Sequence, residues 1–358
     1  MNAVYVVKAV DEDSPFVATQ VRWIRALAGR PEIDRVRVLT ARLGRADLPA
    51  NVTVESFGRG AWPQRSVAFW RRAAALRRAD ADFIFLAQGG GPYPALLLPV
   101  KLALRRPLYH WKAHPDITWR MRLYARYCDD LVFTPTRGSF PLDIDKVRVV
   151  GHGIDTELFA PSGNVPARDL LLLGRISPGK RVDVAIRAIA LCRERTGAAP
   201  GLDVVGPSAD RDEGLRHELQ ALAAELGVAD VVRFMGAIEL ARVPALLEDY
   251  RATLNLSTTA LDKAVVEAMA ACVPVISTNP NAIAVLPDAL KPLLAAPTGD
   301  PASVAAAIQR VLSLERGERA DVGHQLREVV VRDHSLDAFF GKILVEIRDH
   351  MASASQVG

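Results

Sequence analysis

Short apolar runs of strand length alternate along the first part of the chain with segments whose apolar residues recur every three or four positions. Such runs, rich in valine, isoleucine and phenylalanine, predict buried β-strands, and the periodic segments predict amphipathic helices. Helices are expected around 16–29 and 66–79. The expected strands cover residues 3–10, 35–40, 51–57, 82–88, 107–111, 130–135 and 146–151.

The alternation stops at residues 153–169, which contain two prolines and no apolar period and are therefore expected to form a linker. A second series then begins. Its strands are expected at 170–174, 202–206, 231–236, 252–257 and 273–278, and its helices near 180–193, 213–226, 242–249 and 263–271. The sequence thus predicts two similar domains, at 1–160 and 161–334, followed by a helical end at 335–358 that can pack on either domain.

Strands that alternate with helices predict parallel, doubly wound sheets, so the expected fold class is α/β with two Rossmann-like domains. Ligands of such sheets bind beyond the carboxyl ends of the strands, and two domains of this kind can face each other across a central cleft. No G-x-G-x-x-G follows the first strand, and the chain contains no G-x-x-x-x-G-K-[ST]. The common dinucleotide and P-loop phosphate sites are therefore not expected.

The composition is that of a protein of the cytoplasm. The three cysteines lie far apart and form no C-x-x-C pair, which disfavours a disulfide framework or a zinc site. The first residues lack the basic start and long apolar core of a signal peptide. The longest other apolar stretch, 92–104, contains Pro99 and Lys101, so it is not expected to cross a bilayer.

Charge is distributed unevenly between the two halves. Residues 1–160 hold 24 basic and 16 acidic residues, whereas residues 161–358 hold 21 basic and 25 acidic residues. The densest basic stretches, 65–78 and 119–126, also contain aromatic residues. Basic residues interleaved with aromatic ones can bind nucleic acid, an anionic membrane surface or an anionic or lipid-linked partner, or can form an ordinary solvated helix face. No nucleic acid partner is expected, and membrane contact would be peripheral, at the inner face of the membrane.

The segment LLLLGRISPGK, residues 170–180, is the strongest local indication of chemistry. A strand ends at Gly174, Arg175 lies at its carboxyl end, and Lys180 stands where a helix begins. Two cations at such a position suit a diphosphate, because arginine can bind two oxygens at once and lysine supplies a point charge. A solvated loop is the alternative.

Lys263 stands in the first turn of an expected helix, where a cation is unfavourable because a helix N-terminus is itself positive. A phosphate brought to that helix end would reverse the preference. Glu267 lies one turn later on the same face and can accept hydrogen bonds from ribose hydroxyls. The alternative is that Lys263 and Glu267 only pair with each other on the surface.

Five ordered segments resemble the large retaining glycosyltransferase family 4, whose members have the GT-B fold. They are GHGIDTELF (151–159), LLLGRISPGKRVDVAIRAI (171–189), LDVVGPS (202–208), LGVADVVRFMGAI (226–238) and VVEAMAACVPVIST (265–278). The resemblance implies a first domain that binds the acceptor, a second that binds a nucleotide-sugar donor, and a C-terminal helix that crosses back to the first domain. It implies no cofactor beyond a co-substrate, a UDP- or GDP-linked sugar.

By this resemblance, the donor diphosphate and sugar would contact Gly174, Arg175, Lys180, Asp262, Lys263, Ala264 and Val265. Met235, Gly236 and Ile238 would hold the base, largely through backbone, and Glu267 would bind the ribose as the second glutamate of the family's E-x7-E motif. The first glutamate of that motif is replaced by Thr259, and Asp262–Lys263 resembles a variant found in a subset of the family.

The first domain offers further candidates. His114, in the loop after the strand at 107–111, resembles the histidine that the family places near the donor sugar, and Arg175 and Lys180 would complete the catalytic set. Asp11, Asp13 and His110 are candidate acceptor contacts, and no metal is expected. The sequence therefore predicts a glycosyltransferase. A nucleotide-sugar-binding protein without transferase activity, and a sugar-nucleotide epimerase or hydrolase, remain alternatives.

Overall fold

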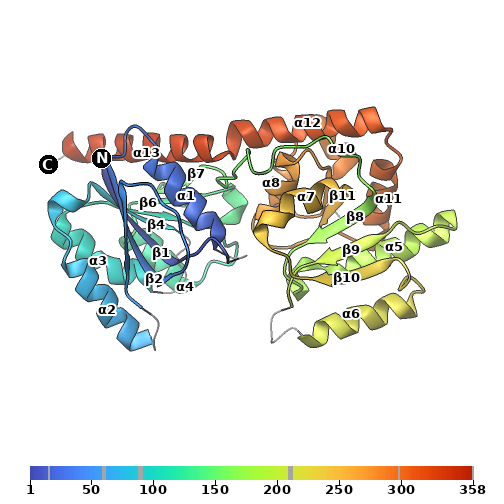
Figure 1. Cartoon of the computed structure of the whole chain (residues 1–358), viewed down its shortest axis with the longest axis horizontal. Helices are drawn as coiled ribbons and strands as arrows, with labels where there is room; N and C mark the ends of the chain where they lie inside the picture. Colours follow the sequence, from blue (N-terminus) through green and yellow to red (C-terminus); the bar gives the residue numbers. More distant parts are fainter. Residues whose placement is uncertain (15–16, 59–61, 88–91, 209–212, 297–298, 357–358) are drawn as a thin grey trace. The chain divides into compact units, whose positions relative to one another are not determined.

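The computed structural model describes residues 1–14, 17–58, 62–87, 92–208, 213–296 and 299–356. The chain forms two compact units (Figure 1), one of residues 1–153 with 336–358 and one of residues 154–335. The boundary between Gly153 and Ile154 precedes the expected end of the first domain by seven residues, and the last helix belongs to the first unit.

The first unit contains a seven-stranded parallel sheet in the order β3-β2-β1-β4-β5-β6-β7. Its strands are β1 (Asn2–Val10), β2 (Arg35–Leu43), β3 (Val52–Ser56), β4 (Phe83–Ala87), β5 (Leu108–Trp111), β6 (Leu131–Thr134) and β7 (Val147–Val149). Its α-helices are α1 (Ala18–Ala28), α2 (Trp62–Ala74), α3 (Tyr93–Leu104), α4 (Trp119–Tyr127) and α13 (Leu336–Gln356). Short 3₁₀ turns, η1 (Arg78–Asp80) and η2 (Arg137–Ser139), complete the described elements.

Helices cover both faces of this sheet because successive residues of a strand point to opposite sides. Tyr5 of β1 packs in a cluster with α1 and α13, whereas Val4 and Val6 pack in another with α2 and α3. The α13 helix is held by aromatic contacts, with the rings of Trp23 and Phe339 centred 4.5 Å apart.

The second unit contains a five-stranded parallel sheet in the order β10-β9-β8-β11-β12. Its strands are β8 (Arg168–Leu173), β9 (Leu202–Val205), β10 (Val232–Gly236), β11 (Tyr250–Asn255) and β12 (Val275–Ser277). Its longer helices are α5 (Val182–Thr196), α6 (Glu213–Glu225), α8 (Lys263–Ala270), α11 (Pro301–Leu312) and α12 (Arg316–Asp333). Shorter elements are η3 (Pro178–Lys180), η5 (Leu240–Arg242), α7 (Val243–Glu248), α9 (Pro280–Ile283), η6 (Asp288–Leu290) and α10 (Lys291–Leu294).

All twelve expected strands are present, with ends shifted by a few residues, and the α/β class predicted from the alternation is confirmed. The helices α3, α4 and α9 to α12 were not predicted. The α3 helix contains Pro99 and is apolar on most of its surface, so it lacks the regular alternation of polar and apolar faces by which a helix is recognised.

Candidate functional site

The candidate donor site lies at the carboxyl edge of the second sheet, where the loops after β8 and β11 meet. From β8 the chain crosses to β9 on one side, whereas β11 pairs with the other side of β8. Such a reversal of strand order leaves a crevice at the carboxyl ends of the strands. The two loops touch, since the Thr258 N–H donates to the Gly179 carbonyl at 3.2 Å.

Glycines at the strand ends bring backbone segments close together. Gly174 has φ 149° and Gly206 has φ 152°. A Cβ on Gly206 would lie 1.9 Å from the Gly174 carbonyl oxygen, so no larger residue fits there. The Gly206 N–H in turn donates to the Gly236 carbonyl at 2.8 Å. The ends of β8, β9 and β10 therefore form a compact backbone floor beneath the candidate site.

Arg175 follows this floor directly and is exposed. Within the ranges that the structure describes, its guanidinium makes no hydrogen bond or ion pair. A guanidinium keeps its charge and offers five donors in a fixed plane. Arg175 therefore has hydrogen-bond donors available for a ligand, and its contact with a diphosphate remains a prediction.

Lys180 and Asp262 form a close ion pair between the two loops. The Lys180 Nζ lies 2.6 Å from both carboxylate oxygens of Asp262, and Asn255 donates to the same carboxylate at 2.7 Å. Burial acts to raise the pKa of Asp262, but the Lys180 charge and the hydrogen bonds from Lys180, Ser257 and Asn255 outweigh it, so the pKa lies below its usual value. Asp262 is therefore a carboxylate at neutral pH.

This pairing leaves the start of α8 without a side-chain cap. Asp262 is the N-cap residue, yet its carboxylate makes no capping hydrogen bond because it faces Lys180 and Asn255. The Val265 side chain is buried in the core, and its N–H donates to the Asp262 carbonyl at 3.2 Å. A donor contact of Val265 would therefore have to use its backbone, and it remains a prediction.

Lys263 pairs with Glu267, as in the alternative interpretation of the sequence, although Glu267 is buried and does not lie on the surface. Their Nζ and Oε1 atoms lie 2.8 Å apart, and the Glu267 side chain is only 5% exposed. A buried carboxylate needs a partner, which gives Lys263 a structural reason for its place at the helix start. A ribose contact at Glu267 would have to be made beside, or in place of, this lysine.

Sequence reasoning missed Asn255 and Asn279, whose hydrogen bonds hold the loop that follows β11. Asn279 is fully buried and donates to Ser257 Oγ at 3.0 Å and to the Thr259 carbonyl at 3.1 Å. Asn255 ends β11 and Asn279 stands two residues after β12, whose last residue, Ser277, donates to the Asn255 carbonyl at 2.9 Å. Polar residues near the ends of two neighbouring strands could have indicated this role from the sequence.

The expected nucleoside contacts lie at the end of β10. Met235 is 51% exposed, and Gly236 has φ 77°, which favours glycine. The Ile238 side chain packs against the core, so a contact with a base would have to use its backbone. The predicted roles of these residues remain predictions.

The candidates in the first unit differ in accessibility. His114 is exposed, with Nδ1 3.1 Å from the Asp116 carbonyl oxygen. His110 is fully buried in β5, with Nδ1 3.2 Å from Asp129 Oδ2. The structure corrects the expectation for His110, because a side chain with no exposed surface cannot contact an acceptor.

The acidic residues after β1 are engaged with arginines or with each other. Asp13 pairs with Arg45 at 2.5 Å, and this hydrogen bond and charge lower its pKa. The Asp13 N–H donates to Asp11 Oδ1 at 3.3 Å. Among the described residues, no group of three or more His, Cys, Asp or Glu side chains is placed to hold a metal. In the same ranges, no helix is both long and apolar enough to cross a bilayer.

The sequence of the second unit supplies the first comparison with known proteins. Residues 155–329 match the family model of glycosyl transferases group 1. This unit therefore resembles a group 1 glycosyl transferase. The matched segment contains β8 to β12 and every residue of the candidate donor site described above.

Curated relatives named D-inositol 3-phosphate glycosyltransferase match parts of the chain. The relative from Acidothermus cellulolyticus is 29% identical over 59% of this chain and 51% of its own length. The relative from Saccharomonospora viridis is 34% identical over 51% of this chain and 46% of its own length. The chain thus covers at most about half the length of these relatives.

Solved structures match the whole fold. The Anabaena protein HepE, in complex with UDP-glucose, superposes with a TM-score of 0.72 at 18% identity, over 99% of this chain and 100% of that chain. Sucrose-phosphate synthase from Thermosynechococcus elongatus superposes with a TM-score of 0.76 at 17% identity, over 99% and 100%. Together with the two Rossmann-like sheets, these likenesses confirm the expected GT-B fold class.

Proposed function

We propose that this protein is a retaining, family 4-type glycosyltransferase that moves a sugar from a UDP- or GDP-linked donor to an acceptor hydroxyl. The observation that carries the proposal is the exposed Arg175 beside the Lys180–Asp262 pair, at the strand-order reversal of the unit that matches the group 1 glycosyl transferases. Complexes of the structurally similar HepE with UDP and UDP-glucose support a nucleotide-sugar donor.

Arg175 is the main side-chain ligand of the diphosphate in this proposal. The charges of Lys180 and Lys263 are balanced by Asp262 and Glu267, so Arg175 is the cation at these loops that, among the described residues, forms no ion pair. Lys180 can still contribute, because an ammonium has three donors and Asp262 accepts from it through two oxygens. The uncapped start of α8 adds a favourable potential for phosphate.

Catalysis then rests on positioning and on stabilising the leaving group. The bond between the anomeric carbon and the diphosphate oxygen breaks, and the acceptor oxygen bonds to that carbon on the same face. The acceptor proton passes to an oxygen of the departing diphosphate. His114, exposed after β5, is proposed to contact the donor sugar.

A panel of UDP-, GDP- and dTDP-sugars tests the proposal. Each donor is incubated with the protein and varied acceptors, and released nucleoside diphosphate and thermal stabilisation are measured in parallel. We expect one donor class both to stabilise the protein and to release nucleoside diphosphate only when an acceptor is present. The anomeric configuration of the product, measured by NMR, should equal that of the donor.

The second candidate function is nucleotide-sugar binding without transfer. Thr259 stands exposed where the family motif has its first glutamate, and a threonine cannot replace a carboxylate that braces the sugar. Donor-dependent stabilisation without release of nucleoside diphosphate, for every acceptor, would support this function. Release of free sugar or conversion of the donor without acceptor would instead indicate a hydrolase or epimerase.

The Lys263→Gln variant separates a donor contact from a purely structural pair. Glutamine can still donate a hydrogen bond to Glu267 but leaves that buried carboxylate without a positive partner, so the melting temperature should fall. We expect the donor dissociation constant to rise about tenfold, equivalent to ~1.4 kcal/mol. The matched control is Lys291→Gln, which breaks the exposed pair with Asp288 at 2.5 Å and should leave donor binding unchanged. An unchanged donor dissociation constant in Lys263→Gln would show that Lys263 only pairs with Glu267 and does not contact the donor.

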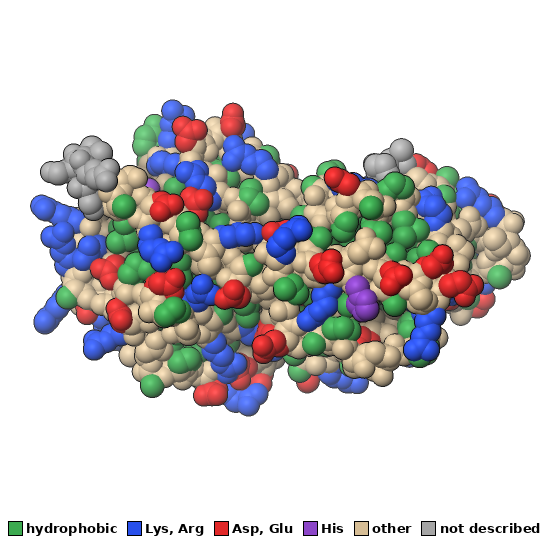
Figure 2. All heavy atoms as spheres, turned by 90° about the horizontal axis from the view of Figure 1, so that it is seen from above, with side chains coloured by type: hydrophobic (Ala, Val, Ile, Leu, Met, Phe, Trp, Pro, Cys, Tyr) green, Lys and Arg blue, Asp and Glu red, His purple; other side chains and the backbone are tan. Residues whose placement is uncertain are grey.

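We also propose that the first unit lies against an anionic membrane at its cytoplasmic face, through α4. Figure 2 shows many Lys and Arg side chains on one face of the molecule, and α4 adds basic residues of its own. On α4, Trp119 is 69% exposed, Leu123 46% and Tyr127 65%, and their spacing of four residues places them on one side of the helix. Exposed arginines flank this apolar stripe at 120, 122 and 126, as in interfacial helices.

Flotation with vesicles containing phosphatidylserine tests the role of α4. The wild-type protein should float at low salt, and the Trp119→Ala/Tyr127→Ala variant should lose most of that binding because two interfacial aromatic anchors are removed. Vesicles of neutral lipid are the control and should bind neither protein. Equal flotation of both proteins would show that α4 does not contact the membrane. No flotation of the wild type at low salt would contradict the membrane proposal.

A further inference from the structure

A pocket opens at the amino ends of the second unit's strands, at the sheet edge opposite the candidate donor site. Tyr250 and Arg251, the first residues of β11, line it together with Val273 and Pro274, which precede β12. Its volume is about 250 Å³. Since the six residues of β11 span roughly 17 Å, the pocket and the donor loops are separate sites of one unit.

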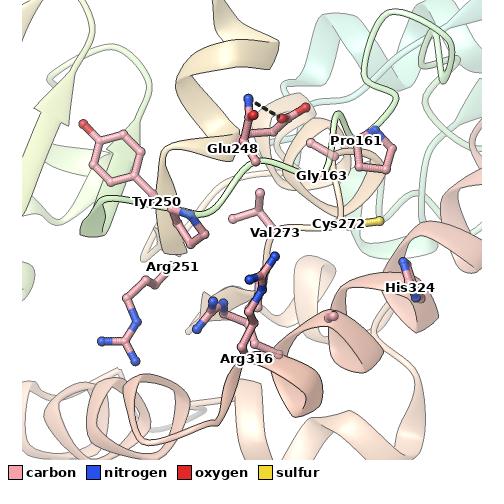
Figure 3. Close-up of a pocket in the computed structure, with 15 residues that line it drawn as sticks. Pro161, Gly163, Glu248, Tyr250, Arg251, Cys272, Val273, Arg316 and His324 are labelled. Atoms are coloured by element: carbon pink, nitrogen blue, oxygen red, sulfur yellow. Dashed lines mark hydrogen bonds between the residues drawn. The ribbon is translucent and has the colours of Figure 1, made fainter.

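Three arginines converge on this pocket from two elements. Arg251 comes from β11, and Arg316 and Arg319 come from the first turns of α12, three residues apart and thus on the same face. Figure 3 shows the side chains of Arg251 and Arg316 among the residues that line the pocket. The positive end of α12 is an unfavourable place for cations unless an anion joins them.

The arginines differ in how their charge is balanced. Arg251 lies 3.6 Å from Asp169 and donates to the Leu312 carbonyl, so its side chain is held by the protein. Within the described ranges, neither Arg316 nor Arg319 forms an ion pair. Burial lowers the pKa of Arg319, and the neighbouring charges of Arg251 and Arg316 lower it further. The cluster therefore carries an excess of positive charge.

Among the described residues that line the pocket, Glu248 alone is acidic, and its single negative charge offsets only part of this excess. Glu248, on the pocket wall, accepts from the Ser162 N–H at 2.9 Å, from the Ser162 hydroxyl and from Asn164 at 3.4 Å. Glu318 accepts from the Glu315 N–H at 2.9 Å as part of the helix cap. The electrostatics thus favour an anion from outside the protein.

We propose that this pocket binds a small phosphate-bearing anion through Arg316 and Arg319, with Arg251 as a third, rigidly held cation. Guanidinium groups bind phosphate oxygens two at a time, and three of them suit a group with charge near −2. Sites for drug-sized ligands are usually larger, about 300–1,000 Å³, so a sugar phosphate or pyrophosphate fits better than a nucleotide-sugar. The proposal is independent of the donor site.

Cys272 provides a local reporter, because it lines this pocket and is half-buried, whereas Cys128 and Cys192 are buried. Burial raises the pKa of the Cys272 thiol, so alkylation by iodoacetamide is followed above neutral pH, with mass spectrometry to locate the label. A bound anion would cover the thiol and raise its pKa further. At about ten times the dissociation constant, the ligand should slow labelling about tenfold.

Inorganic pyrophosphate and glucose 6-phosphate are tested separately, to distinguish a free diphosphate from a sugar phosphate. Either should protect Cys272 in the wild type and in Arg175→Ala, which removes the main proposed donor contact. The Arg316→Gln/Arg319→Gln variant should lose the protection while keeping its melting temperature. Arg187→Gln/Arg195→Gln, two exposed arginines of α5, is the matched control and should behave as wild type. No protection by either ligand, or equal protection in Arg316→Gln/Arg319→Gln, would overturn the proposal.

Discussion

Replacing Arg175 by alanine should lower turnover by about a hundred- to a thousandfold, the usual loss when one preorganised donor to a developing negative charge is removed. The reason is that, in the described part of the chain, Arg175 forms no ion pair, whereas the lysines of the donor loops, Lys180 and Lys263, pair with carboxylates. Its side chain is exposed, so stability should change by no more than about 0.5 kcal/mol. Steady-state kinetics with the best donor of the panel, together with melting temperatures, measures both quantities.

Two further variants define the cause of this loss. Arg175→Lys keeps the charge but not the planar pair of donors, so it should recover only part of the activity. Arg187→Ala, on the exposed face of α5, is the matched control and should retain normal turnover. Near-normal transfer by Arg175→Ala would exclude Arg175 as the ligand of the leaving group.

Replacing Asp203 by asparagine should destabilise the second unit by about 3 kcal/mol, the lower end of the cost of breaking a buried ion pair. Asp203 lies on β9 and is 1% exposed. Its carboxylate accepts from Arg168 of β8 at 2.7 Å, from Arg233 of β10 at 2.7 Å and from the Tyr250 hydroxyl of β11 at 2.5 Å. One side chain thus links four of the five strands of this sheet.

Calorimetry of the unfolding transition checks this prediction. For a unit of this size, 1 kcal/mol corresponds to roughly 2–4 °C, so the melting temperature should fall by about 10 °C. The matched control is Asp230→Asn, which alters an exposed pair with Arg193 at 2.7 Å and should shift the melting temperature little. A shift no larger than that of the control would show that the hydrogen bonds of Asp203 to three neighbouring strands contribute little to the stability of the second unit.

The effect of Asp203 should also depend on pH. Burial acts to raise its pKa, but the hydrogen bonds from Arg233, Tyr250 and Arg168 prevail and lower it. A carboxyl whose folded-state pKa is depressed contributes its full stability above its unfolded pKa, and this contribution is lost as the pH falls through the folded value. The difference in the free energy of unfolding between wild type and Asp203→Asn should therefore be constant near neutral pH and become smaller below about pH 4.

The strands could be predicted from the sequence because a buried parallel strand is a nearly continuous apolar run, as in residues 170–173 and 202–205. The helices were harder to predict from the sequence. The long α12 helix was missed, although its buried residues Val322, Leu326 and Val330 recur every four positions, because charged residues dominate the rest of it. The α4 helix was recognised only as a basic stretch, since just Ala125 is buried along it.

The candidate site was predictable as a set of residues but not as a set of pairs. The sequence placed Arg175 at a strand end and Lys180 and Asp262 in the loops that follow strands, and parallel strands bring such loops to one edge. It could not show that Asp262 binds Lys180 rather than capping its own helix, because the partners are 82 residues apart. The contacts of Asp203 and the pocket lined by Arg251, Arg316 and Arg319 could not be predicted for the same reason, because their residues come from several elements.

The most direct test of the donor site is a calorimetric titration of UDP and of GDP into the wild type, Arg175→Ala and Arg316→Gln/Arg319→Gln. We predict that one nucleoside diphosphate binds the wild type and the Arg316→Gln/Arg319→Gln variant equally well. Arg175→Ala should bind it at least about tenfold more weakly, a loss of ~1.4 kcal/mol. Equal affinity in Arg175→Ala, or no binding of either nucleotide to the wild type, would contradict a donor diphosphate site at the loops after β8 and β11.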